Sequence, residues 1–238
     1  MEVLIVVPTY NEVDNLVPLV GALLNLDLDM GLLVVDDGSP DGTGEAAEGL
    51  AAKDKRVNVL QRGAKMGLGS AYSQGFSWGL ENTQAPFLVQ MDADFSHDPA
   101  MVPVLLEAAR PGMVAVGSRY VPGGGVRNWS LWRRMISRFG CLYAESILDM
   151  GVRDATSGFK CWPRQALQAI DLNGTLCDGY AFQIEMSWRA LKAGFSLKEV
   201  PITFVDRGCG QSKMSTRIAM EAAWKVWYLK RLNRRLTK

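Results

Sequence analysis

The amino-acid sequence predicts a single α/β domain built on a mostly parallel β-sheet. Short apolar segments alternate with helical patterns along the chain, as expected when each strand is followed by a helix that crosses back over the sheet. The first apolar segment, residues 3–7, is aliphatic throughout, which predicts a strand covered on both faces. Charged residues follow several of these segments, at the strand ends where such sheets bind their ligands.

The first half of the chain supplies most of this alternation. Residues 13–26 carry leucine and valine at helical spacing, and Thr43 can cap the next helix. Gly67 and Gly69 lack the third glycine of a dinucleotide fingerprint and the end of a P-loop, so we interpret them as packing residues. Predicted strands cover residues 3–7, 32–35, 57–60, 87–89 and 113–116, and predicted helices cover residues 13–26, 45–52, about 65–80 and 101–109.

A long helical pattern with an apolar stripe follows the glycines at residues 123–125. The pattern fits either a helix packed on the sheet or an amphipathic helix that rests on a membrane surface, and the residues favour neither. The stripe consists of Trp132, Met135, Ile136, Phe139, Leu142, Tyr143, Ile147 and Met150, and it leaves out Arg133, Arg134 and Arg138.

The last part of the chain is predicted to end in a basic amphipathic helix. In residues 216–236 the leucines at 229, 232 and 236 cluster, and the late lysines and arginines occupy the opposite side, which favours an anionic membrane surface as partner. Residues 205–214 contain glycine and two cations and are interpreted as a mobile flap. Between the two long helices we predict a loop at 154–159, helices at 164–170 and 182–193, and an extended segment at 195–204 that Pro201 interrupts.

The composition argues against several classes of protein. The net charge of +1 disfavours a globally basic nucleic-acid-binding protein. The chain contains no run of about 18 consecutive apolar residues, the length that a membrane-spanning helix requires. The four cysteines form no CxxC pair, which favours a reduced cytosolic chain over a disulfide framework or zinc site. A single histidine, His97, excludes a His-rich metal site. No signal peptide is expected, because the first residues already form a strand.

Two carboxylates spaced by one residue follow the strand predicted at residues 87–89. Asp92 and Asp94 can turn toward one hard divalent cation, Mg²⁺ or Mn²⁺, whose remaining ligands are phosphate and water. Taken alone, the segment fits an ordinary Asx turn better, with Asp98 capping the next helix. The metal-site interpretation becomes the better one because other strand ends on the same edge also carry charge, at Glu12, Asp36, Asp37 and Arg119.

Several short motifs follow one another along the chain, each occurring once. They are Pro-Thr-Tyr-Asn-Glu at 8–12, Val-Asp-Asp-Gly-Ser-Pro-Asp-Gly-Thr at 35–43, Met-Asp-Ala-Asp-Phe-Ser-His at 91–97, Gly-Ser-Arg-Tyr at 117–120, Asp-Ala-Thr-Ser-Gly-Phe at 154–159, and Phe-Val-Asp-Arg at 204–207 with Ser212 and Lys213. In this order and spacing the chain resembles the inverting family-two glycosyltransferases of GT-A fold, and among them the dolichol-phosphate (polyprenol-phosphate) mannose synthases that lack transmembrane helices. The resemblance extends over residues 3–214.

That resemblance implies a role for each of a set of residues. It assigns the donor nucleotide sugar to Pro8, Tyr10, Glu12, Val35, Asp37, Met91, Asp92, Ala93, Asp94, Arg207 and Lys213. It assigns Mg²⁺ or Mn²⁺ to Asp92 and Asp94, and Ser96 is a third candidate ligand because some relatives have a metal-binding Gln at this position and others a Ser. It assigns the acceptor phosphate to Arg119, Arg133 and Ser157, and the catalytic set to Asp94, Arg119, Arg133, Arg207 and Lys213.

The implied reaction is metal-dependent transfer of mannose from GDP-mannose to a dolichyl or other polyprenyl phosphate, with inversion. A lipid phosphate is already anionic, so the reaction needs no strong general base, and loss of GDP is the step to be stabilised. Transfer from another donor, such as UDP-glucose, and an inactive membrane-associated nucleotide-sugar-binding subunit are the alternatives.

The resemblance also predicts how the chain is organised. We expect a catalytic domain at residues 1–214, which includes an amphipathic helix at about 129–150, and a basic amphipathic helix at 215–238. The protein is expected on the cytoplasmic face of a membrane, bound peripherally, with no nucleic-acid partner and no obligate protein subunit.

Overall fold

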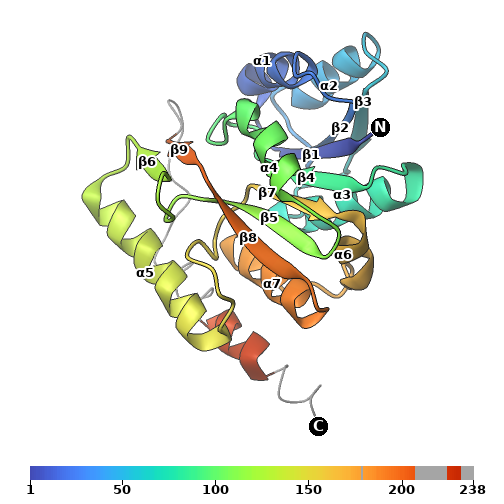
Figure 1. Ribbon diagram of the computed structural model, residues 1–238. Helices are drawn as coiled ribbons and strands as arrows, with labels where there is room; N and C mark the ends of the chain where they lie inside the picture. Colours follow the sequence, from blue (N-terminus) through green and yellow to red (C-terminus); the bar gives the residue numbers. More distant parts are fainter. Residues whose placement is uncertain (178, 207–223, 232–238) are drawn as a thin grey trace.

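The computed structural model confirms the predicted α/β architecture (Figure 1). It describes residues 1–177, 179–206 and 224–231. The strands of the central sheet stand in the order β3-β2-β1-β4-β7-β5-β8, and neighbours run parallel except where β7 pairs with β4 and β5. These strands are β1 (Val3–Thr9), β2 (Met30–Asp36), β3 (Val57–Gln61), β4 (Phe87–Gln90), β5 (Met113–Ser118), β7 (Lys160–Pro163) and β8 (Ser196–Pro201).

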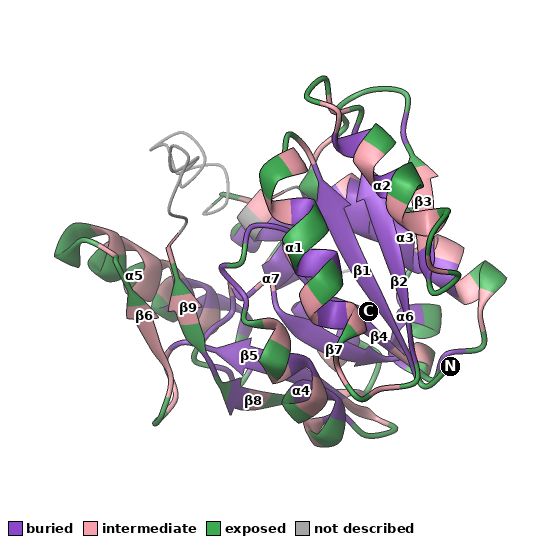
Figure 2. Cartoon of the chain, turned by 90° about the horizontal axis from the view of Figure 1, so that it is seen from above, coloured by how far each residue is buried: buried purple, intermediate pink, exposed green. Residues whose placement is uncertain are grey.

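Helices cover both faces of this sheet, and the strands between its edge strands β3 and β8 are almost entirely buried (Figure 2). Along β1, Val3 and Ile5 belong to one hydrophobic cluster and Leu4 and Val6 to another, because successive side chains of a strand point to opposite faces. The first cluster includes residues of α1 (Val13–Leu24), α2 (Thr43–Ala51) and α4 (Val102–Ala108). The short 3-10 helix η1 (Pro99–Met101) comes directly before α4. The second includes residues of α3 (Leu68–Asn82), α6 (Arg164–Ala169) and α7 (Gly179–Lys192).

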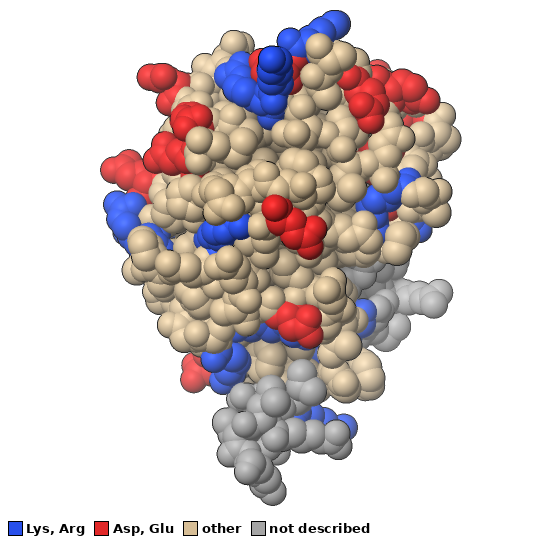
Figure 3. Space-filling view, turned by 90° about the vertical axis from the view of Figure 1, so that its right-hand side faces the viewer, with Lys and Arg blue, Asp and Glu red and all other residues tan. Residues whose placement is uncertain are grey.

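The apolar stripe of α5 (Leu131–Leu148) is divided between two environments. Toward the end of the helix, Ala144, Ile147 and Leu148 are buried in a third cluster with residues of α7 and of the helical segment 224–231. Toward its start, Leu131, Trp132, Met135, Phe139 and Leu142 are exposed. On the side of the molecule at the right in Figure 1, away from α5, acidic and basic side chains are scattered among the other residues (Figure 3). Packing against α7 and residues 224–231 therefore accounts for only one end of the stripe.

Two short strands had no counterpart in the sequence-based prediction. They are β6 (Gly125–Arg127), which pairs in parallel with β9 (Thr203–Val205), and β7 in the middle of the main sheet. β7 escaped prediction because its four residues, Lys-Cys-Trp-Pro, include a lysine and a proline and show no apolar periodicity. The extended segment at 195–204 forms β8 and β9. The proposed flap beyond residue 206 lies outside the described residues, as does the final helix apart from residues 224–231.

α3 packs so closely on the sheet that there is no room for a side chain at the position of one of its glycines. A Cβ at Gly75 would lie 2.5 Å from Val6 Cγ1 and 3.0 Å from Val35 Cγ2. We expect Gly75→Ala to lower the free energy of unfolding by about 1–3 kcal/mol, measured by chemical denaturation, because the helix must move off the sheet.

Gly49 on α2 supplies the matched control. A Cβ at this position would meet nothing within 4 Å, so Gly49→Ala should raise stability by up to about 1 kcal/mol through better helix propensity. Equal stability of the two alanine variants would contradict the close approach of α3 to the sheet.

Candidate active site

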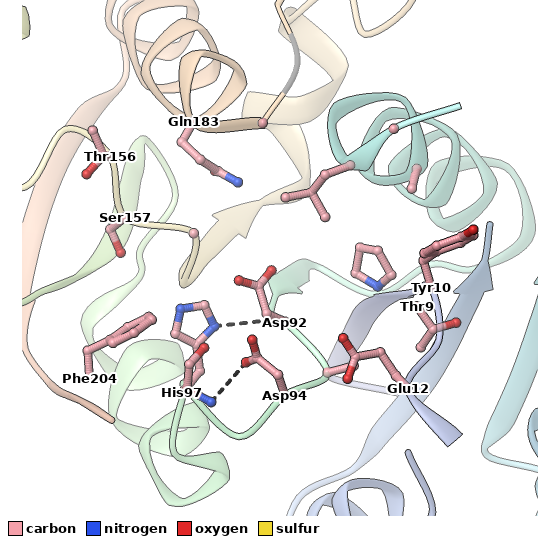
Figure 4. Close-up of a pocket in the computed structure, with 18 of the residues that line it drawn as sticks. Thr9, Tyr10, Glu12, Asp92, Asp94, His97, Thr156, Ser157, Gln183 and Phe204 are labelled. Carbon is pink, nitrogen blue, oxygen red and sulfur yellow. Dashed lines mark hydrogen bonds between the residues drawn. The ribbon is translucent and has the colours of Figure 1, made fainter. Parts of the chain in front are cut away.

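A cavity of ≈ 360 Å³ lies at the carboxyl ends of the first strands of the sheet (Figure 4). It brings together most of the residues that the sequence selected, although they come from widely separated parts of the chain. Those that line it are Pro8, Tyr10, Glu12, Asp37, Asp92, Ala93, Asp94, Ser96, Arg119, Arg133 and Ser157. Its volume is within the range of small-molecule sites.

Four of the selected residues are not among those that line the cavity. Val35 and Met91 are fully buried, and their side chains belong to the hydrophobic clusters on the two faces of the sheet. Arg207 and Lys213 lie outside the described residues. The described wall of the cavity therefore contains the selected acidic residues and the two arginines of the expected acceptor side, Arg119 and Arg133.

The loop after β4 holds its two carboxylates through specific contacts (Figure 4). The Tyr72 hydroxyl, on α3, donates to Asp92 Oδ1 over 2.8 Å. The Ser96 backbone N–H donates to Asp94 Oδ1 over 3.0 Å. Phe95 between them has a φ of 58°, a left-handed conformation that is uncommon outside glycine and recurs at functional sites. The loop is thus held in one defined conformation.

His97 completes this loop from its far end. Its Nδ1 accepts a hydrogen bond from the Asp92 backbone N–H over 3.2 Å, and its ring stacks on Phe159 with 4.8 Å between centroids. Burial lowers the pKa of His97, and the nearby charges of Asp92 and Asp94 offset this only in part. The imidazole is therefore neutral near pH 7, which agrees with Nδ1 as an acceptor. These two contacts tie the loop that carries Asp92 to Phe159.

The donor atoms of this loop fit a hard divalent cation. Asp92 and Asp94 supply carboxylate oxygens, and the buried Ser96 hydroxyl has no hydrogen-bond partner within the described residues. The described part of the chain contains no group of three or more His, Cys, Asp or Glu suited to a metal. Mg²⁺ and Mn²⁺ bound with substrate phosphates need only one or two carboxylates, so this sparse set suits such a metal.

At one end of the cavity, Asp37 shapes the loop that leads into α3. It accepts hydrogen bonds from the backbone N–H groups of Met66 and Gly67, each over 3.0 Å, and forms a buried ion pair with Arg62 at 2.9 Å. The loop brings the Lys65 amine to 3.7 Å from the centre of the Tyr10 ring, a cation–π contact. This end of the cavity therefore offers an aromatic ring beside a cation.

At the other end, Arg119 and Asp154 form a buried bidentate ion pair. Arg119 Nε and Nη2 donate to the two carboxylate oxygens over 2.7 and 2.6 Å, and Nη2 also donates to Thr156 Oγ1 over 2.8 Å. Burial works against both charges, but their mutual attraction outweighs it, so the pKa of Arg119 is raised and that of Asp154 is lowered. Arg119 is thus a fixed, permanently charged group in the cavity wall.

Arg133 reaches the same end of the cavity from α5. It forms an ion pair with Asp206 at 2.5 Å, and its guanidinium lies 4.4 Å from the centre of the Trp129 ring. Ser157 donates its hydroxyl to the Gly117 carbonyl over 2.5 Å and so holds the loop behind Arg119. The geometry therefore gathers, at one end of the cavity, the two arginines that the resemblance assigned to an acceptor phosphate.

Comparison with known proteins identifies the family. The profile described as "Glycosyl transferase family 2" matches residues 4–170. The chain belongs to glycosyl transferase family 2. It is 48% identical over 226 residues to "Polyprenol monophosphomannose synthase" of Mycolicibacterium smegmatis, with 94% of this chain and 84% of the relative covered. It is 47% identical over 226 residues to "Undecaprenyl-phosphate mannosyltransferase" of Micrococcus luteus, with 95% and 93% covered. These relatives confirm the resemblance stated from the motifs.

Solved structures confirm the GT-A fold of this glycosyltransferase. Glucosyl-3-phosphoglycerate synthase from Mycobacterium tuberculosis, in complex with UDP, has a TM-score of 0.65 and 16% identity, with 96% of this chain and 79% of that chain covered. The same enzyme with Mn²⁺, UDP-glucose and phosphoglyceric acid gives 0.66 and 17%, with the same coverage. In the described part of this chain, no helix combines the length and the apolar character that crossing a membrane requires.

Sequence reasoning missed several residues of the glycosyltransferase site. His97 entered it as evidence against a His-rich metal site and as the last residue of the motif at 91–97, without a role of its own, and Lys65 entered it only as the start of a helix. Asp154 was noted within a motif, yet its pairing with Arg119 joins residues 35 positions apart and has no local sequence signal. The position of His97 at the end of the motif that holds Asp92 was the one available sign of its role.

Proposed function

We propose that this glycosyltransferase transfers mannose from GDP-mannose to a polyprenyl phosphate, with inversion at the anomeric carbon. The observation that carries the proposal is a single cavity with an acidic loop, Asp92 to Asp94, and a pair of arginines, Arg119 and Arg133, in its wall. Such a cavity suits two phosphate-bearing substrates. The names of the relatives at 48% and 47% identity, a polyprenol monophosphomannose synthase and an undecaprenyl-phosphate mannosyltransferase, support the same pair of substrates.

The residues divide into a donor group and an acceptor group. Pro8, Tyr10, Glu12 and Asp37 face the nucleoside, while Arg207 and Lys213 are proposed to bind the diphosphate. Asp92 and Asp94, with Ser96, would hold Mg²⁺ or Mn²⁺, which neutralises charge on a diphosphate leaving group when bound. Arg119 and Arg133 orient the acceptor phosphate, whose oxygen is anionic and attacks without a general base. The rest of the rate then comes from positioning and fixed charges.

The proposed function is tested by a donor panel with purified protein, Mn²⁺ or Mg²⁺ and a polyprenyl phosphate. GDP-mannose is expected to give polyprenyl β-mannosyl phosphate and GDP, separated by chromatography and assigned by NMR. Higher kcat/KM with UDP-glucose or another nucleotide sugar would transfer the assignment to that donor. Absence of transfer with every donor would favour an inactive nucleotide-sugar-binding subunit.

Arg133→Ala tests the acceptor side. Arg133 contacts Asp206 and Trp129 at the cavity wall, so its loss should leave the donor end unchanged. We expect KM for the polyprenyl phosphate to rise about tenfold or more, as for loss of a charge-assisted hydrogen bond, while KM for GDP-mannose changes little. Steady-state kinetics with each substrate varied in turn measures this. A larger effect on GDP-mannose would contradict the assignment of Arg133 to the acceptor.

We further propose that the exposed part of α5 rests on the membrane that carries the acceptor. The patch of Leu131, Trp132, Met135, Phe139 and Leu142 is exposed between 53% and 77%, an unusual concentration of large apolar side chains. Arg133, which belongs to the same helix, lines the cavity, so a lipid phosphate could enter from this surface. Trp224, Trp227 and Tyr228 are also exposed, and the predicted basic helix at 215–238 would add cations on the cytoplasmic face.

The pair of substitutions Trp132→Glu and Phe139→Glu is expected to weaken binding to anionic phospholipid vesicles by about tenfold or more, because both rings leave the interface. Vesicle sedimentation without substrate measures the partition coefficient. Val17→Glu on α1 is the control, since Val17 is 49% exposed but lies on another helix. Equal binding by all three proteins would show that α5 does not contact the lipid.

A further inference from the structure

Gln183, on α7, lines the cavity on the side that faces Asp92, and none of the sequence motifs includes it (Figure 4). The residue is only 3% exposed, so its position is fixed by packing. A buried amide has an acceptor oxygen and a donor nitrogen, and burial is favourable only when both find partners. The hydrogen bonds that Gln183 makes within the protein therefore decide which of these two atoms is left for a ligand.

Donors within the protein are hydrogen-bonded to the oxygen of the Gln183 amide. Gln183 Oε1 accepts hydrogen bonds from Gln90 Nε2 over 2.6 Å and from Lys160 Nζ over 3.1 Å. Gln90 is itself oriented by Trp162, whose indole N–H can only donate and does so to Gln90 Oε1 over 3.2 Å. Because donors stand at both ends of this chain of contacts, the orientation of the Gln183 amide follows from the network.

Lys160 strengthens this assignment. Its amine is fully buried and also donates to the Gln183 carbonyl over 3.0 Å. Burial lowers the pKa of Lys160 to about 7, and in either protonation state the amine keeps N–H groups to donate. The Gln183 nitrogen is thereby left for the cavity, where Figure 4 shows it pointing, and no acceptor among the described residues is hydrogen-bonded to it.

The space beside this nitrogen is kept open by Gly158. A Cβ on Gly158 would lie 3.6 Å from Gln183 Nε2 and 3.6 Å from Asp92 Oδ2. A small group placed at this point would therefore contact both a neutral donor and a carboxylate. A hydroxyl group matches this pair best, because it can accept from the amide and donate to the carboxylate at the same time.

We propose that the Gln183 amide nitrogen donates a hydrogen bond to a hydroxyl of the sugar that is transferred, and that Gln90 and Lys160 position the amide for it. The proposal rests on the proposed function, because it takes a nucleotide sugar as the bound molecule. It makes Gln183 a residue that selects the donor sugar. A site built around a substrate hydroxyl rejects analogues that lack that hydroxyl, and this property can be measured.

The test uses GDP-mannose analogues that each lack one mannose hydroxyl. For the analogue that lacks the hydroxyl bound by Gln183, the wild-type kcat/KM should be about 10- to 100-fold below that for GDP-mannose, because a buried donor is then left unpaired. Gln183→Met, which keeps the side-chain length, should lower kcat/KM for GDP-mannose by a similar factor but barely change it for that analogue. A general structural defect would lower kcat/KM for every analogue alike, and this result would overturn the proposal.

Further variants test the network around Gln183. Gln183→Glu keeps an oxygen for Lys160 and Gln90 but removes the N–H groups, so it should lose the same discrimination. Lys160→Met replaces a buried amine with a side chain of similar length, and it should weaken the discrimination while the protein stays folded, checked by thermal denaturation. Wild-type discrimination in Lys160→Met would remove Lys160 from the proposal. Gln168→Met, at an exposed site on α6, is the control.

Two further measurements distinguish a failure of the Gln183 proposal from a failure of the proposed function. Affinity for GDP with Mn²⁺, measured by calorimetry, should be the same in Gln183→Met as in the wild type, because the amide is assigned to the sugar. If the wild type prefers another nucleotide sugar, the deoxy series of that donor replaces the mannose series, and the expectation for Gln183 stands. If the wild type binds and transfers no nucleotide sugar, both proposals are wrong.

Discussion

Asp94→Ala is expected to reduce metal-dependent transfer by about 10³-fold, because the leaving diphosphate loses the ligand that holds its counter-charge. The fold should survive, since the hydrogen bond from the Ser96 N–H to Asp94 lies within one loop at the cavity. Transfer assays over a range of Mn²⁺ concentrations, with circular dichroism as a check on folding, measure both effects.

Asp27→Ala serves as the control for this variant. Asp27 is an exposed carboxylate in the connection between α1 and β2 and should leave the rate unchanged. Binding of Mn²⁺ in the presence of GDP should be lost in Asp94→Ala and retained in Asp27→Ala. A folded Asp94→Ala protein with substantial transfer activity would remove this carboxylate, and the metal with it, from the mechanism.

Arg119→Met is expected to lower the free energy of unfolding by about 3–5 kcal/mol, because the buried carboxylate of Asp154 loses its partner. It should also impair transfer through loss of a fixed charge beside the acceptor. Adding Asp154→Leu should restore much of the stability, because the unpaired charge is gone, but none of the activity. Urea denaturation and steady-state kinetics of the single and double variants separate the two effects.

The pH dependence of this variant has a defined sign. In the wild type the pKa of Asp154 is lowered from 3.8, so its contribution to stability is present above that pH and is lost as the pH falls through the folded-state value. Without the Arg119 guanidinium, burial raises the pKa of the carboxyl, and only the weaker hydrogen bonds from the backbone N–H at position 119 and from the Cys141 thiol oppose it. Protonation of Asp154 therefore reduces the cost of its burial as the pH falls. The stability gap between wild type and Arg119→Met should therefore shrink between neutral pH and about pH 4. A constant gap would show that Asp154 is not the cause.

The candidate site was predictable to the extent that its residues follow strands. Glu12, Asp37 and Asp92 stand just beyond apolar segments, and parallel strands bring their carboxyl ends to one edge, so their proximity follows from the fold class. Asp154 and Gln183 could not be found this way, because neither follows a predicted strand. Each acts through a contact with a distant residue, Arg119 in one case and Lys160 in the other.

The sequence by itself determined the alternation of strands and helices, the charged edge of the sheet and the family, because local periodicity and motif spacing depend only on neighbouring residues. The tertiary structure alone decided where β7 is inserted, since its buried lysine is stable in the sheet only when Gln183 accepts its hydrogen bonds. It also decided how the α5 stripe is used. The same apolar pattern buries Ile147 and exposes Phe139, because α7 and residues 224–231 cover only one end of the helix.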